Sequence, residues 1–209
     1  MNRIYLHTLP VRMWHWLNVL CFVVLIVTGV QIRYRGILDL MSFQTAVDVH
    51  NFAGFSLIGL FLFWAAYYTA SGNMKVYIPD LNIKRFVENA WKQAVYYGYG
   101  IFRGEPNPHH ATLDHKFNPM QQLAYFSIMF FLMPVLIATG LLLWDLDRFV
   151  AVFDLLGGIK AVSAAHLLVA IFFAAFLFVH IYLTTLGRTP LEHIKAMFTG
   201  YEEEPEKGH

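Results

Sequence analysis

The sequence predicts an all-α protein, an integral membrane four-helix bundle with an additional cytoplasmic interfacial amphipathic helix. Of its 209 residues, 57% are hydrophobic and only 14% are charged, and the mean hydropathy is +0.49. A soluble domain of this composition would aggregate, so the chain belongs in a membrane. Because apolar stretches run along most of its length, we expect a single membrane domain over residues 1–209.

Four stretches are long enough to cross a bilayer, which requires about twenty mostly apolar residues. They lie at about 12–34, 46–70, 119–144 and 161–186. Each should be helical, since a backbone in hydrocarbon must satisfy its hydrogen bonds internally. The first and second stretches, and the third and fourth, are joined by short connections, which predicts antiparallel neighbours. No small-residue cleavage site follows the first stretch, so we expect a retained helix rather than a signal peptide.

The distribution of positive charge predicts the orientation. Eleven of the fifteen Lys and Arg residues fall in the N-terminus, the 71–118 connection and the C-terminal tail. The two short loops hold the remaining four, which are Arg33, Arg35, Arg148 and Lys160. Because cytoplasmic loops of membrane proteins carry the excess of Lys and Arg, both termini are expected in the cytoplasm.

The long connection contains a fifth helix, at about 82–98. Its apolar residues recur three and four positions apart, at Ile83, Phe86, Val87, Ala90, Trp91, Ala94 and Val95. Lys84, Arg85 and Lys92 fall away from that face. Such a pattern is typical of a helix that lies in the membrane interface.

The composition also excludes several kinds of site. The single cysteine, Cys21, lies within an apolar stretch, so the chain has no disulfide framework, no thiolate cluster for iron–sulfur binding and no motif for a covalently attached haem. The positive charges form no basic stripe, which argues against a nucleic-acid role. Any redox cofactor must therefore be held by other side chains.

Four histidines lie near the ends of apolar stretches at matching depths. With the N-terminus inside, His15 pairs in depth with His180, and His50 pairs with His166. His166 and His180 are fourteen residues apart, about 21 Å along a helix. Fourteen residues are also two heptads, so both imidazoles should face the same side of the fourth helix.

Paired imidazoles within an apolar bundle are typical axial ligands of an electron-transferring haem, and two pairs would hold two haems. Zinc is the competing metal, but two histidines without Cys or carboxylate partners make a poor zinc site. A histidine at a helix end can also be a plain interfacial residue. The other six are expected to be solvated: His7, His109, His110, His115, His193 and His209.

Two further segments have both a structural and a functional interpretation. Arg12, one turn before His15, could pair with a haem propionate, or it could be a positively charged membrane anchor. Asn118 before Pro119 predicts a helix N-cap. Amide groups of Asn118 and Gln121 could in addition bind the carbonyl oxygens of a quinone, at the level of the haem held by His15 and His180.

The motifs together resemble a known family, the di-haem cytochrome b membrane subunits of bacterial respiratory formate dehydrogenases, nickel–iron hydrogenases and thiosulfate reductases. The resemblance rests on the four histidines and on the following segments: Arg12-x-x-His15-Trp16-x-Asn18, Thr28-Gly29, His50-x-x-x-Gly54, Lys116-Phe117-Asn118-Pro119-x-Gln121 and Thr139-Gly140. It covers nearly the whole chain. The Phe102–Pro106 loop and the long connection look closest to the thiosulfate-reductase branch.

The resemblance implies that His15, His50, His166 and His180 ligate two b-type haems, with Asn118 and Gln121 near a menaquinone or ubiquinone site. It also implies an iron–sulfur or multihaem c-type cytochrome subunit and a catalytic subunit on the periplasmic side of the bacterial inner membrane. The direction of electron flow stays open.

We therefore expect an electron-transfer subunit of a quinone-linked oxidoreductase complex. Two alternatives remain at this point. One is a stand-alone di-haem membrane oxidoreductase, such as a superoxide:quinone oxidoreductase. The other is a haem-free membrane anchor or transporter, which the lack of acidic residues expected to be buried in the helices disfavours.

Overall fold

A computed structural model describes residues 3–109, 117–187 and 189–203. It contains four helical spans long and apolar enough to cross a membrane. They are α1 (Leu9–Arg33), α2 (Phe43–Ala70), the span Pro119–Trp144, and α7 (Ile159–Thr184). The predicted all-α membrane bundle is therefore confirmed. Lys116 and the loop histidines His110 and His115 lie outside the described residues.

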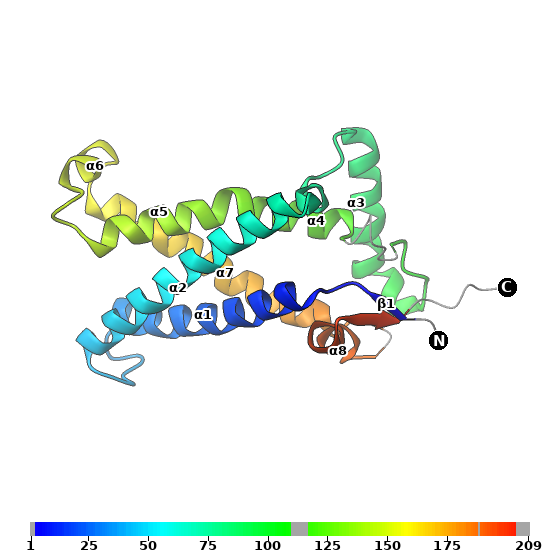
Figure 1. Ribbon diagram of the computed structural model, residues 1–209, viewed down its shortest axis with the longest axis horizontal. Helices are drawn as coiled ribbons and strands as arrows, with labels where there is room; N and C mark the ends of the chain where they lie inside the picture. Colours follow the sequence, from blue (N-terminus) through cyan, green and yellow to red (C-terminus); the bar gives the residue numbers. More distant parts are fainter. Residues whose placement is uncertain (1–2, 110–116, 188, 204–209) are drawn as a thin grey trace.

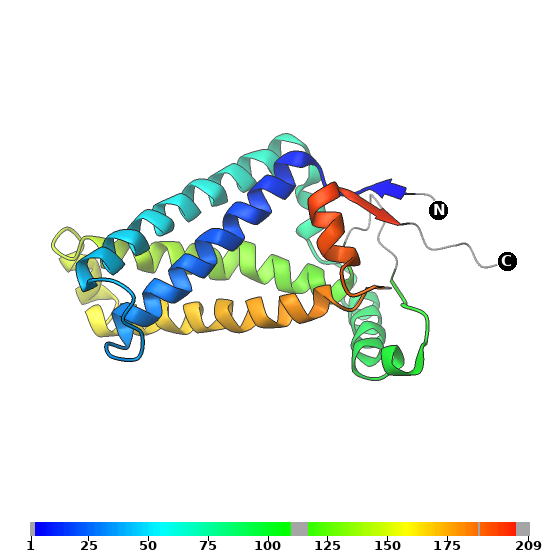
Figure 2. The same cartoon turned by 90° about the horizontal axis from the view of Figure 1, so that it is seen from below.

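The four spans form one elongated bundle, with α1 packed along α2 and α5 packed along α7 (Figures 1 and 2). Trp14 donates a 2.8 Å hydrogen bond from its indole nitrogen to the carbonyl of Leu60, which ties α1 to α2. Buried apolar side chains from α2, α7 and the third span make the core, including Leu57, Met133 and Phe173. The predicted antiparallel pairs are the ones that form.

The third span differs from the regular helix expected at 119–144. It consists of α4 (Pro119–Ser127), a π-helical turn (Ile128–Leu132) and α5 (Met133–Trp144). The N–H of Met133 bonds to the carbonyl of Ile128, five residues back. Pro134 follows directly, and a proline has no N–H and crowds the carbonyl four residues before it, which favours such a widened turn.

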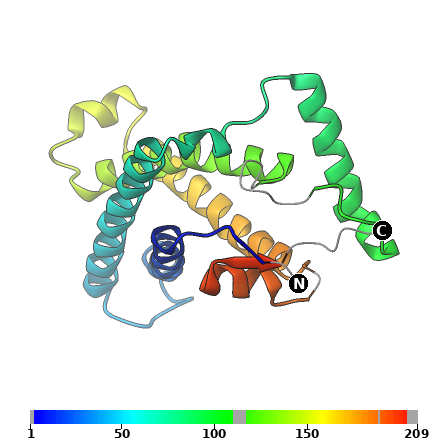
Figure 3. The same cartoon turned by 45° about the vertical axis from the view of Figure 1, so that its right-hand side comes forward.

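The fifth helix, α3 (Ile83–Gly98), forms as expected and crosses the end of the bundle at a steep angle (Figures 1 and 3). Asn82 caps it, its side chain accepting a 3.1 Å hydrogen bond from the N–H of Arg85. Gln93 is buried, whereas the apolar stripe Ile83, Val87, Trp91 and Val95 is exposed. Two short 3₁₀ helices, η1 (Asn73–Tyr77) and η2 (Gly100–Arg103), flank it.

Several short elements were not predicted. Strand β1 (Arg3–Tyr5) pairs antiparallel with β2 (Tyr201–Glu203), so the first and last described segments of the chain meet. Helix α8 (Glu192–Thr199) leads into β2 and lies beside α1 (Figure 2). Helix α6 (Val150–Leu155) lies at the opposite end of the bundle, in the loop between α5 and α7 (Figure 1).

Candidate functional site

The fold brings the four histidines together in two pairs. His15 of α1 faces His180 of α7, with ring centroids 6.2 Å apart and ring planes at 54°. His50 of α2 faces His166 of α7, at 6.5 Å and 66°. We call His15–His180, near the end that carries the termini, the inner pair, and His50–His166 the outer pair. These are the pairs that the depths in the sequence predicted.

The separation of the rings fits one metal ion between each pair. Two metal–nitrogen bonds of about 2 Å and two imidazole radii of about 1 Å give centroids about 6 Å apart. Within the described ranges no three His, Cys, Asp or Glu side chains gather around a common point. Each pair can thus supply two opposed nitrogen ligands, as the iron of a bis-histidine haem requires, and lacks the third and fourth ligands of a zinc site.

A threonine and a glycine stand against each ring of the outer pair. The hydroxyl of Thr28 lies 2.8 Å from Nδ1 of His50, and the hydroxyl of Thr139 lies 2.9 Å from Nδ1 of His166. A Cβ at Gly29 would come within 3.5 Å of His50, and a Cβ at Gly140 within 3.3 Å of His166. The bare backbone at each glycine thus leaves room for the imidazole ring of a neighbouring helix.

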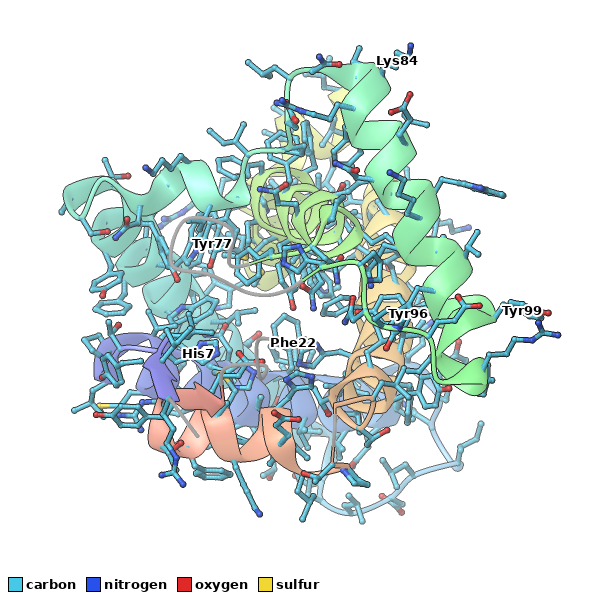
Figure 4. All side chains as sticks on the ribbon, turned by 90° about the vertical axis from the view of Figure 1, so that its right-hand side faces the viewer. His7, Phe22, Tyr77, Lys84, Tyr96 and Tyr99 are labelled. Carbon is cyan, nitrogen blue, oxygen red and sulfur yellow. The ribbon has the colours of Figure 1, made fainter. Side chains whose placement is uncertain are left out.

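A pair of aromatic rings separates the two histidine levels. Phe173 lies midway between His166 and His180 on α7, and its ring contacts Phe22 of α1 at 5.0 Å. Figure 4, which looks along the bundle, shows Phe22 among the four helices. The inner and outer pairs are therefore distinct sites with apolar side chains between them.

Beside His15, the guanidinium of Arg12 bonds to the carbonyl of Phe198 in α8. Its Nε is buried, and neither it nor the buried Nδ1 of His15 has a hydrogen-bond partner among the described residues. Trp16 also reaches α8, stacking on Phe198 at 4.4 Å. A buried guanidinium nitrogen without a partner is suited to an anionic group such as a propionate.

The residues predicted for quinone binding form a capping box at the start of α4. Asn118 is 3% exposed, and its Oδ1 accepts a 2.9 Å hydrogen bond from the N–H of Gln121. Oε1 of Gln121 accepts in return from the N–H of Asn118. The side-chain amide of Asn118 also donates 3.1 Å to the hydroxyl of Tyr97 in α3. Burial raises the pKa of Tyr97, so this hydroxyl stays protonated at neutral pH.

A series of aromatic rings connects this corner to the inner pair. Phe117 contacts Tyr125 at 4.8 Å, and Tyr125 contacts Phe176 at 6.5 Å. Phe176 stacks on the imidazole of His180 at 5.7 Å. The capping box and the inner pair therefore belong to the same end of the bundle.

The threonine hydroxyls and Tyr97 were not predicted as site residues. The signal for the threonines was present, since Thr-Gly occurs within the spans only at residues 28–29 and 139–140. Tyr97 lies in a different segment from Asn118, and no spacing rule connects them. Their contact depends on how α3 folds back on the bundle.

Comparisons with known proteins found matches over most of the chain. Residues 6–200 match the sequence profile of a family described as prokaryotic cytochrome b561. A relative in Escherichia coli K12, described as "Putative cytochrome YdhU", is 37% identical over 201 residues, which are 96% of this chain and 75% of the relative.

Two further relatives carry the names of enzyme subunits. The "Probable Ni/Fe-hydrogenase 1 B-type cytochrome subunit" of Escherichia coli K12 is 30% identical over 155 residues, 71% of this chain and 63% of that protein, so the chain spans less than two thirds of its length. The "Formate dehydrogenase, cytochrome b556 subunit" of Haemophilus influenzae is 26% identical over 147 residues, 68% of this chain and 55% of that protein.

Proposed function

Since the chain belongs to the prokaryotic cytochrome b561 family, we propose that it carries two b-type haems and transfers electrons across the membrane between a periplasmic redox partner and the quinone pool. The observation that carries this proposal is that the imidazole rings face each other in two pairs. The ring centroids are 6.2 Å apart in one pair and 6.5 Å apart in the other. One haem would be held by His15 and His180, and the other by His50 and His166.

The residues have simple roles in such a protein. A haem with two imidazole ligands supplies an iron that accepts and gives one electron without an open coordination position. The histidines orient it, and the apolar helices exclude water. Arg12 would neutralise a propionate of the inner haem. His166 and His180 place the two sites about 21 Å apart along α7, which lets one helix serve both sides of the bilayer.

We place the quinone at the cytoplasmic end, near Asn118 and Gln121. The rings of Phe117, Tyr125 and Phe176 link this corner to His180. A quinone head group needs hydrogen-bond donors at its carbonyl oxygens, which the amides of Asn118 and Gln121 and the protonated Tyr97 hydroxyl can provide. Menaquinone and ubiquinone both meet this description.

The names of the relatives support a proposal about partners. Because those include cytochrome subunits of a hydrogenase and a formate dehydrogenase, we propose an iron–sulfur or multihaem c-type cytochrome subunit and a catalytic subunit on the periplasmic side. The protein would then be a multi-pass component of the bacterial inner membrane, with both termini and α3 in the cytoplasm.

Haem spectra of the purified full-length chain test the ligand assignment. Reduced with dithionite, it should show b-type α-bands and two haems per chain by pyridine haemochrome. His15→Ala and His180→Ala should each remove one haem, and His50→Ala and His166→Ala should each remove the other. His193→Ala is the matched control and should retain both. A chain that binds no haem, or four variants that all lose the same haem, would refute the proposal.

The quinone site requires a variant that separates capping from binding. Asn118→Ser keeps an N-cap hydroxyl but removes the amide, so α4 should stay folded while the KM for a quinol analogue rises about tenfold. Asn118→Ala removes the cap as well and should cost about 1 kcal/mol of stability. An unchanged KM in Asn118→Ser would contradict the assignment of this residue.

A further inference from the structure

Two threonine hydroxyls contact the outer histidine pair in the same way, although they come from different helices. Thr28 of α1 reaches Nδ1 of His50 at 2.8 Å, and Thr139 of α5 reaches Nδ1 of His166 at 2.9 Å. In each case a glycine follows the threonine and leaves room for the ring. Because the same hydrogen bond occurs at both rings, we treat it as part of the site and not as packing alone.

The direction of these hydrogen bonds follows from counting protons. A hydroxyl has one proton, and each of these hydroxyls lies 2.7 Å from the carbonyl four residues back, that of Val24 for Thr28 and that of Val135 for Thr139. A carbonyl can only accept, so the hydroxyl proton is directed there. The hydroxyl oxygen must then accept from the histidine, which requires a proton on Nδ1.

The backbone supports the same assignment. The carbonyls of Leu25 and Leu136 also lie within hydrogen-bonding reach of His50 and His166, respectively. A carbonyl can only accept, so these contacts also favour a proton on the imidazole nitrogen that faces them. With the proton held on Nδ1, the lone pair of each imidazole is on Nε2, the atom that must point at a metal between the rings.

We propose that Thr28 and Thr139 are positioning residues that fix the tautomer of the outer pair and lower the reduction potential of the haem it holds. The inference rests on the proposed function. A hydrogen bond donated from Nδ1–H makes the imidazole a stronger electron donor, which stabilises the ferric over the ferrous iron. His15 of the inner pair lacks such a partner among the described residues, so the effect belongs to the outer haem.

Redox titration of the full-length protein, followed at the haem α-bands, tests this. Thr28→Val and Thr139→Val keep the shape of the side chain and remove the acceptor. Each should raise the midpoint potential of one haem, by about 59 mV if the reduction equilibrium changes tenfold, and leave the other haem as it was. The shifted haem is identified in a His15→Ala background, which retains only the outer haem.

Thr28→Ser retains the hydroxyl and should titrate like the wild type. Ser56→Ala removes a hydroxyl of α2 that donates to its own helix, at the carbonyl of Phe52, and should shift neither haem. If Thr28→Val loses the outer haem and Thr28→Ser keeps it, the positioning role is supported. Loss of that haem in Thr28→Ser as well would overturn it.

Failure of this inference and failure of the proposed function give different results. Unchanged midpoint potentials in Thr28→Val and Thr139→Val, with both haems bound, would overturn the inference and leave the proposed function standing. A wild-type chain without haem would refute the proposed function itself.

Discussion

At the scale of single residues, the outer histidines are held between a hydroxyl and a bare helix backbone. A Cβ at Gly140 would lie 3.3 Å from Cε1 of His166, closer than carbon atoms normally approach, whereas a Cβ at Gly29 would lie at an ordinary 3.5 Å from His50. His166 cannot turn away freely, because its Nδ1 is 2.9 Å from the hydroxyl of Thr139. A side chain is therefore tolerated less well at Gly140 than at Gly29.

This difference gives a prediction for two matched variants. Gly140→Ala should displace the imidazole of His166 and weaken retention of the outer haem, at an overpacking cost of about 1–3 kcal/mol. Gly29→Ala should retain both haems and have an unchanged or slightly higher Tm, because alanine favours a helix. Haem content after purification and thermal unfolding measure both effects. Equal haem loss in the two variants would contradict this account.

Single residues also mark the limit of what the sequence could predict. The histidine pairs were predictable, because helix rise and heptad spacing fix the depth and the face of residues on one helix. The contact between Thr28 and His50 was not, since it depends on how far α1 is rotated about its own axis against α2. That rotation follows from the packing of many side chains, and no spacing rule encodes it.

At the scale of elements, long apolar segments were predicted well and short ones were missed. The spans end within about three residues of their predicted bounds. A stretch of about twenty apolar residues in a membrane has no stable alternative to a spanning helix. Strands β1 and β2 are three residues each and pair across almost the whole chain. They meet where α8 packs on α1, through the stacking of Phe198 on Trp16.

The attachment of α8 to β2 should depend on pH. His193 of α8 lies 3.5 Å from the carboxylate of Glu202, and this hydrogen bond raises the pKa of His193, against the opposing effect of burial. Glu202 and the nearby Glu192 both favour its protonated form. A raised pKa stabilises the fold fully below the ordinary value of about 6.5, and the contribution is lost as pH rises through the raised value.

We therefore expect the β1–β2 amides, and those of Leu6 and His7 that bond to the carbonyl of Gly200, to exchange hydrogen faster at pH 8 than at pH 6 beyond the intrinsic pH effect. His193 is partly exposed, so the change should be at most about 1 kcal/mol. Hydrogen exchange of His193→Gln supplies the reference, since it should show the intrinsic dependence alone. If the wild type and His193→Gln have the same pH profile of hydrogen exchange, the contact between His193 and Glu202 does not have this role.

At the scale of the whole molecule, most of the positive charge lies at one end of the bundle. Strands β1 and β2 meet in one sheet, and α3 crosses the same end of the bundle (Figures 1 and 3). The segments at that end carry eleven of the fifteen Lys and Arg residues. Four spans require both termini on one side, and we propose from the positive charge that this side is the cytoplasm.

Labelling of single cysteines can test that orientation. With Cys21 replaced by Ala, we expect Asp39→Cys and Asp147→Cys, in the two short loops, to react with a membrane-impermeant maleimide in intact bacterial spheroplasts. Lys84→Cys, at the start of α3, should react only after the membrane is opened. All three positions are exposed to solvent, so accessibility within the fold does not bias the result. The reverse pattern would place the inner histidine pair and the Asn118 corner in the periplasmic half of the bilayer, which would contradict the cytoplasmic quinone site that we propose.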